Sequence, residues 1–202
     1  MKKAQKSEIY RKMIHVSSII LPFSYRYLFL SNRKLFFLVL APLTLLALII
    51  EIVRLENKTF KRIFYNIFGI MLREYEKNNF TGASYLLISA VISIAVFPQD
   101  IAFIALSFLA IGDTAAALIG IPFGKRKLLG TKKSLEGSIA CFSATLLFAV
   151  FFLNPAEYNV PIIALVGAIS ATVAEFSQVS INDNIKIPIF SGLVMSFVNI
   201  FF

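Results

Sequence analysis

The chain has 202 residues, 58% of them hydrophobic, and a mean hydropathy of +0.79. A soluble domain of this length could not bury so much apolar surface in one core, so the excess is expected to face lipid. The 20 basic residues outnumber the 11 acidic ones, but they fall between apolar runs, which favours membrane topology over nucleic-acid binding. A single cysteine, Cys141, and a single histidine, His15, exclude disulfides and histidine-cluster metal sites.

Seven apolar runs are candidate transmembrane helices, because a helix needs about 20 mostly apolar residues to cross the hydrocarbon layer. They cover residues 13–30, 35–53, 83–97, 101–121, 135–153, 161–176 and 187–202. The first is the weakest, since Pro22 and Arg26 interrupt it. The sequence therefore predicts an all-α, polytopic bundle of about seven transmembrane spans, which forms a single integral membrane domain over residues 1–202.

A different pattern occupies residues 59–73. Its apolar residues recur at the spacing of one helix face, while its basic residues lie off that stripe. This pattern is typical of an amphipathic helix that lies flat at the membrane interface. Packing of the same stripe against the other helices is the alternative.

The distribution of Lys and Arg predicts the orientation of the chain. Most basic residues lie in the N-terminal tail and in the second, fourth and sixth connections, whereas the opposite side holds only Arg26, Arg33 and Lys34. By the positive-inside rule, the N-terminus is expected to be cytoplasmic. The N-terminus lacks a small-residue cleavage site before its apolar stretch, and we interpret it as mature sequence.

Asp113 lies within the fourth apolar run, in the sequence Gly112-Asp113-Thr114. An acidic side chain there costs about 3 kcal/mol on insertion scales, which makes it a candidate functional residue. The alternative is an aspartate that hydrogen-bonds to a neighbouring helix for packing. Gly112 and the small residues after Asp113 allow close backbone approach or a helix break.

The connection that follows this run, residues 124–137, carries five basic residues, three glycines and two hydroxyls. Glycines let backbone amides approach phosphate oxygens, and lysines neutralise their charge. A plain topology loop would explain the lysines alone. Ser134, however, is placed to cap the next helix, which begins with Glu136 and Gly137, and a helix N-terminus favours phosphate.

A third cluster consists of Glu175, near the end of the sixth run, and Asp183 and Asn184 in the loop after it. Oxygen ligands of this kind suit Mg²⁺, which takes one or two carboxylates and completes its shell with substrate phosphates. An ordinary turn would explain Asn-Asp-Asn alone. The cluster is expected on the same membrane side as residues 124–137, which we call the basic loop.

Three weaker signals remain. Arg11 and Lys12 with His15 form either a functional basic edge or an interfacial anchor of the first run. Glu51 and Arg54 are spaced for a simple i, i+3 ion pair. Thr81-Gly82 is interpreted as an ordinary helix start.

These motifs occur in the order found in the CTP-dependent lipid-alcohol kinases, a family that includes dolichol kinase, phytol kinase and the fungal CTP-dependent diacylglycerol kinase. The chain resembles that family over nearly its whole length. The block from Asp113 to Gly137 carries the most specific part of the resemblance, including Phe123-Gly124-Lys125 and Lys133-Ser134-Leu135-Glu136-Gly137. The remaining elements are supportive: Arg11-Lys12-x-x-His15, Glu51-x-x-Arg54, Thr81-Gly82, Glu175 and Asp183-Asn184-x-x-x-Pro188.

The resemblance implies transfer of the terminal phosphate of CTP to the hydroxyl of an isoprenoid alcohol or diacylglycerol, with Mg²⁺, at the cytoplasmic face. Catalytic carboxylates would then come from Asp113, Glu175 and Glu136, with Asp113 and Glu175 both open as the base. Asp113, Asp183 and Asn184 would hold the metal. The triphosphate would be bound by Lys125, Lys127, Lys132, Lys133, Ser134 and Gly137.

Two other functions remain open. The Asp113-to-Gly137 block is also similar to one in phosphatidate cytidylyltransferases, although their C-terminal Asp-Arg-x-Asp stretch has no match here. A small transporter would place Asp113 and Glu175 along a pathway, but it predicts polar residues spread through the bilayer and inverted repeats, and the sequence has no repeat. The sequence leaves the acceptor lipid and the oligomeric state undetermined.

Overall fold

The computed structural model describes residues 15–127 and 133–202, and every regular element in those ranges is helical. In chain order these elements are α2 (Ile20–Phe23), the π-helix η1 (Ser24–Leu28), α3 (Arg33–Glu56), α4 (Lys58–Phe68), the 3-10 helix η2 (Tyr75–Lys77), α5 (Gly82–Val96), α6 (Gln99–Phe123), α7 (Leu135–Phe152), α8 (Val160–Phe176) and α9 (Asp183–Val198). The predicted all-α helical bundle is therefore confirmed.

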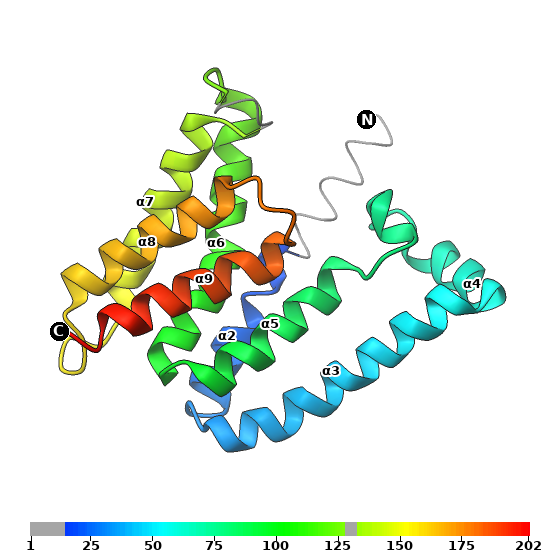
Figure 1. Ribbon diagram of the computed structural model, residues 1–202, viewed down its shortest axis with the longest axis horizontal. Coiled ribbons are helices and arrows are strands. Elements are labelled where there is room, and N and C mark those ends of the chain that lie inside the picture. Colours follow the sequence, from blue (N-terminus) through cyan, green and yellow to red (C-terminus); the bar gives the residue numbers. More distant parts are fainter. Residues whose placement is uncertain (1–14, 128–132) are drawn as a thin grey trace.

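Helix α6 forms the centre of the bundle. Residues 101–110 are all buried, and the helix packs against α2, α5, α7, α8 and α9. Alanines alternate with Ile, Phe and Leu along this stretch, so neighbouring helices can approach from several sides. By contrast, α3 lies at the edge, where it contacts α4 and α5 (Figure 1).

The apolar surface is consistent with a membrane protein. Helices α3, α6 and α7 are long and apolar enough to cross a bilayer, and α5 and α8 are shorter apolar helices. Large side chains on the outer face of α3 are exposed, including Leu38 and Leu45. Since exposed leucine faces of this extent are unfavourable in water, they are expected to contact lipid.

Five predicted runs agree closely with α3 and α5 to α8, but the first and the last differ. In the described part of the first run, Pro22 and Arg26 lie in short helical pieces, α2 and η1, rather than in one span. The guanidinium of Arg26 in η1 pairs with Asp100 at the start of α6, 3.2 Å away. The seventh run forms α9, which begins four residues earlier than predicted. Asp183 and Asn184 therefore lie in its first turn, not in a loop.

Successive helices run in alternating directions, so alternate connections lie at the same end of the bundle. Most of the polar residues lie in the connections at one of these ends. At this end α3, α6 and α8 finish, and α5, α7 and α9 begin. We call it the polar end. It carries the C-terminal part of α3, the α4–η2 region, the basic loop and the start of α9 (Figure 1).

The predicted amphipathic helix is α4, and it is shorter than expected, since its helical part ends at Phe68. None of its residues is buried, and Ile63 and Ile67 are more than half exposed. Its apolar face also contributes Phe64 and Phe68 to a cavity. The exposed isoleucines fit a helix at the membrane interface, and the two phenylalanines fit packing toward the bundle. Each of the two interpretations thus describes part of α4.

Candidate functional site

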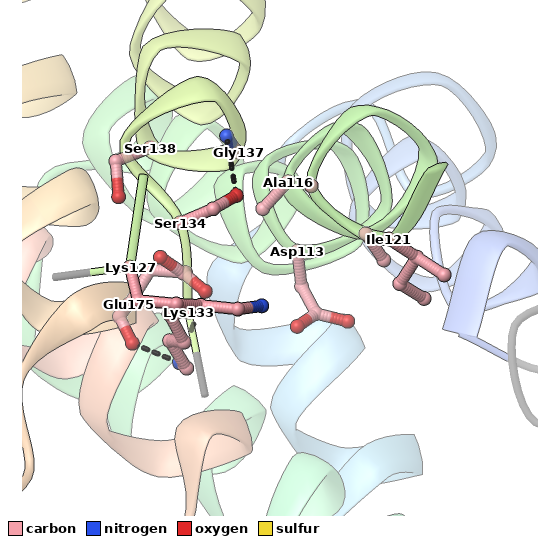
Figure 2. Close-up of a pocket in the computed structure, with 11 residues that line it drawn as sticks. Asp113, Ala116, Ile121, Lys127, Lys133, Ser134, Gly137, Ser138 and Glu175 are labelled. Atoms are coloured by element: carbon pink, nitrogen blue, oxygen red, sulfur yellow. Dashed lines mark hydrogen bonds and ion pairs between the residues drawn. The ribbon is translucent and has the colours of Figure 1, made fainter. Parts of the chain in front are cut away.

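A cavity of about 340 Å³ opens at the polar end between α6, α7 and the end of α8 (Figure 2). Asp113 of α6 lies across it from Glu175 of α8 and from Lys133, just before α7. Its lining comprises Asp113, Ala116, Ala117, Gly120, Ile121, Lys127, Lys133, Ser134, Gly137, Ser138 and Glu175. Six residues that the sequence predicted for the site therefore meet in one cavity.

Close contact between α6 and α7 forms one wall of this cavity. A Cβ added at Gly137 would lie 2.8 Å from the carbonyl oxygen of Ala116 and 3.2 Å from the Cα of Gly120. Only glycine leaves room for this approach. Gly137 is thus a packing residue, and its amide donates to Ser134 Oγ at 3.2 Å instead of pointing freely into the cavity.

The predicted helix cap at Ser134 is confirmed by that hydrogen bond, which fixes the start of α7. The base of the basic loop is closed beside it, because the Leu135 amide donates to the Arg126 carbonyl at 2.9 Å and Lys127 pairs with Ser134. The Glu136 carboxylate accepts from the Arg126 amide at 3.3 Å. Glu136 therefore orders the loop and lies outside the cavity lining.

Lys133 connects two acidic residues from different helices. Its Nζ lies 3.0 Å from Glu175 Oε1 and 3.3 Å from Asp183 Oδ2, and it also donates to the Glu175 carbonyl. Burial alone would lower the pKa of Lys133, but the facing carboxylates of Asp183 and Glu175 raise that pKa above its usual value. The ammonium thus remains charged at neutral pH.

Asp113 contacts the N-terminal part of the chain. Its Oδ2 lies 3.1 Å from His15 Nε2, and about a fifth of the side chain is exposed. Burial tends to lower the pKa of Arg73, but its hydrogen bond to Tyr75 and the charges of Tyr75, Glu76 and Asp113 leave that pKa raised. Asp113 therefore lies beside the His15 imidazole and within electrostatic reach of the Arg73 guanidinium.

Several predicted residues lie apart from this cavity. Lys125 is exposed at the loop base, and Lys132 lies outside the described residues, as do Arg11 and Lys12. Asn184 turns away, with its amide nitrogen donating to the Gly82 carbonyl at 2.7 Å, and lines a second cavity. Its neighbour Asp183 lines neither cavity and pairs with Lys133 at 3.3 Å and with Lys186 at 2.8 Å.

The donor set can be compared with what Mg²⁺ requires. Within residues 15–127 and 133–202, no group of three or more His, Cys, Asp or Glu side chains is arranged to hold a metal. Mg²⁺ bound with a nucleotide does not need such a cage, since one or two carboxylates and phosphate oxygens suffice. Buried Glu175 Oε2 has no hydrogen-bond partner among the described residues. The carboxylates lining the cavity therefore fit a cation that arrives with its substrate.

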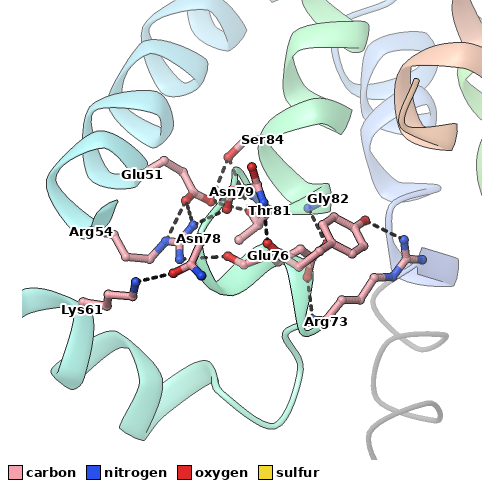
Figure 3. Close-up of polar contacts among 11 residues, drawn as sticks. Glu51, Arg54, Lys61, Arg73, Glu76, Asn78, Asn79, Thr81, Gly82 and Ser84 are labelled. Carbon is pink, nitrogen blue, oxygen red and sulfur yellow. Dashed lines mark hydrogen bonds and ion pairs between the residues drawn. The ribbon is translucent and has the colours of Figure 1, made fainter. Parts of the chain in front are cut away.

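A buried polar network beside the site was not anticipated from the sequence (Figure 3). The predicted Glu51–Arg54 pair is present at 2.5 Å, and Arg54 is fully buried. Glu51 also accepts from the amide and hydroxyl of Thr81, so Thr81 is more than a helix start. Arg54 donates to the carbonyls of Glu76 and Asn79. The network ties α3 to η2 and α5.

Glu76 extends this network toward the site. Its carboxylate accepts from the Arg73 amide at 2.8 Å and from the Gly82 amide at 3.0 Å. The segment after α4 is therefore fixed to the start of α5. Glu76 was not singled out in the sequence, and nothing in its local pattern distinguishes it from a surface glutamate.

The sequence of the chain is similar to those of two fungal proteins. The chain is 27% identical over 158 residues to CTP-dependent diacylglycerol kinase 1 of Schizosaccharomyces pombe, covering 72% of each protein. It is 28% identical over 213 residues to the Saccharomyces cerevisiae protein of the same name, covering 95% of this chain and 73% of that one. The chain is thus similar to proteins named CTP-dependent diacylglycerol kinase. The resemblance inferred from its motifs is confirmed.

The chain is also similar to an uncharacterized protein of Rickettsia prowazekii, with 29% identity over 185 residues, which cover 89% of this chain and 88% of that protein. No family model matches the chain. No solved structure matches it either.

Proposed function

We propose that the chain is a lipid kinase that transfers the terminal phosphate of CTP to the hydroxyl of a membrane lipid alcohol. One observation carries the proposal: the cavity joins Lys127, Lys133 and the capped start of α7 to the carboxylates of Asp113 and Glu175. Cations and a helix N-terminus favour a nucleotide triphosphate, and the carboxylates favour its metal ion. The fungal relatives that are named CTP-dependent diacylglycerol kinase support the choice of CTP and of a lipid acceptor.

Diacylglycerol is the first acceptor to test, because the fungal relatives are named for it. An isoprenoid alcohol offers the same hydroxyl on an apolar tail and remains within the proposal. The reaction is expected at the cytoplasmic face, since the basic residues gather at the polar end of the bundle.

In this reaction the acceptor oxygen forms a bond to the terminal phosphorus, and the bond from that phosphorus to the bridging oxygen breaks, releasing CDP. Lys127 and Lys133 would neutralise the triphosphate, and Lys125 and Lys132 would add charge from the loop. Asp113 would hold Mg²⁺, with Asp183, which contacts Lys133, as a second carboxylate. The Asn184 side chain, expected from the sequence to assist, faces the second cavity instead. When bound, the ion would neutralise charge on the transferred group. Asp113 or Glu175 would accept the hydroxyl proton. Positioning and charge neutralisation are the main requirements of such a transfer.

The test is an assay of the purified protein in detergent with Mg²⁺ and CTP labelled at the terminal phosphate. Diacylglycerol, phytol and a polyprenol would be offered separately, alongside phosphatidic acid. Label is expected in a lipid alcohol, and chelation of Mg²⁺ is expected to abolish the transfer. Label released only as pyrophosphate with phosphatidic acid would instead identify a cytidylyltransferase.

Two matched variants make the assay specific to the cavity. Asp113→Asn keeps the size of the side chain but removes its charge, and a loss of about 100-fold or more in turnover is expected. Asp100→Asn is the same substitution on the same helix at the opposite end, where Asp100 pairs with Arg26. It is expected to retain turnover. Equal activity of wild type and Asp113→Asn would rule out the assigned role of Asp113.

A further inference from the structure

A second cavity of about 560 Å³ lies beside the first and is lined by α4, the segment after it, the start of α5 and residues 15–18. Its volume falls in the range of about 300–1,000 Å³ that is usual for small-molecule sites. The walls are mainly apolar and include Phe64, Phe68, Met71, Leu72, Leu86 and Leu87. Such a lining favours a hydrocarbon chain over a nucleotide.

Polar groups occupy the part of this cavity that is next to the first one. His15 lines the second cavity and lies 3.1 Å from Asp113, which lines the first. Asn184 lines the second cavity, while its neighbour Asp183 contacts Lys133 of the first. Two contacts therefore connect the cavities, one near the N-terminus and one at the start of α9.

The arrangement matches an amphiphile with one polar end. We propose that the second cavity holds the acceptor lipid, with its chain against the α4–α5 wall and its hydroxyl at the His15–Asp113 contact. This inference rests on the proposed kinase function and adds the binding site of the acceptor. A hydroxyl at that contact would lie on the border of the nucleotide cavity, where the terminal phosphate is needed.

The charged groups that line the cavity, Arg73 and Glu76, suit a lipid that carries no positive charge. The Glu76 carboxylate is used by the Arg73 and Gly82 amides, so it fixes the wall and needs no ligand cation. Arg73 lies in the same lining. Its positive charge favours the phosphomonoester that the reaction would produce there.

The decisive experiment narrows the cavity and measures the kinetics for each substrate. Ala83 is an exposed residue of α5 that lines the cavity, so Ala83→Phe adds a ring to open space and not to the core. An increase of about tenfold in the KM for the lipid acceptor is expected, with the KM for CTP unchanged. Ala95→Phe is the matched control, since Ala95 is exposed near the other end of α5. It is expected to leave both KM values unchanged.

Crosslinking tests the cavity independently of turnover. A diacylglycerol with a photoreactive group near the end of one chain is expected to label the peptide containing Phe68, Met71 and Leu72. Unlabelled diacylglycerol should compete, whereas phosphatidylcholine should not. Labelling in an inactive protein would support the site and contradict only the kinase assignment. An active kinase with unchanged acceptor KM in Ala83→Phe, or with label displaced equally by phosphatidylcholine, would overturn the inference.

Discussion

At the scale of single residues, Lys133 differs from the other lysines of the basic loop that the structure describes. Lys125 and Lys127 are exposed, whereas Lys133 is held by carboxylates of α8 and α9. It therefore has two functions in the proposal. It presents positive charge to the triphosphate, and it separates Glu175 from Asp183, whose like charges would otherwise repel.

Replacing this ammonium with an apolar side chain of similar length tests both functions. In Lys133→Met, the half-saturating CTP concentration is expected to rise and turnover to fall, together lowering kcat/KM by about 100-fold or more. Steady-state assays over a range of CTP concentrations measure the change. Lys34→Met, at an exposed residue of the opposite end, is the control. If both variants kept the kcat/KM of the wild type, Lys133 would not contact the nucleotide.

At the scale of elements, the Glu51–Arg54 pair stabilises the junction of α3, η2 and α5. Removing one partner from a buried ion pair typically costs about 3–5 kcal/mol, because the other charge is left buried and uncompensated. Arg54→Met is therefore expected to lower the midpoint of thermal unfolding in detergent markedly. The double variant Glu51→Gln with Arg54→Met should recover part of that loss.

The chain offers a matched comparison for this prediction. Lys77 and Glu74 form an ion pair with the same i, i+3 spacing, but the Glu74 side chain is 88% exposed. Exposed pairs contribute about 0–1 kcal/mol, so Lys77→Met should leave the unfolding midpoint nearly unchanged. Similar midpoints for Arg54→Met and Lys77→Met would show that the buried network adds little stability.

The sequence could predict the bounds of these helices but not the side-chain contacts between them. The bounds of α6 differ from the predicted run by only two residues at each end, because a long apolar run leaves few alternatives. Asp113, Lys133 and Glu175 could be assigned to one end by counting spans. The hydrogen-bond partner of Asn184 could not be predicted, because the rotation of α9 against α5 depends on packing between residues about 100 positions apart. Glu51 and Thr81 meet across 30 positions for the same reason.

At the scale of the whole molecule, charge is distributed very unevenly between the two ends of the bundle. The polar end carries Arg54, Lys58, Lys61, Arg62, Arg73, Lys77, Lys125, Arg126, Lys127, Lys133 and Lys186 among the described residues. The opposite end carries Arg26, Arg33 and Lys34. Two of those three are engaged there, since Arg26 pairs with Asp100 and Arg33 donates to the carbonyl of Phe97. Most basic side chains of the described residues thus lie at the end with the cavities.

This asymmetry predicts a cytoplasmic polar end, which engineered cysteines can test. Cys141 is buried, so the wild-type protein is expected to react little with a membrane-impermeant maleimide. Glu74→Cys adds a thiol at the polar end, and Ala156→Cys adds one to the exposed turn between α7 and α8 at the other. In intact cells, labelling is expected at position 156 only, and position 74 should react after permeabilisation. The reverse pattern would place the cavities outside the cell, where CTP is not supplied, and would contradict the kinase proposal together with the orientation.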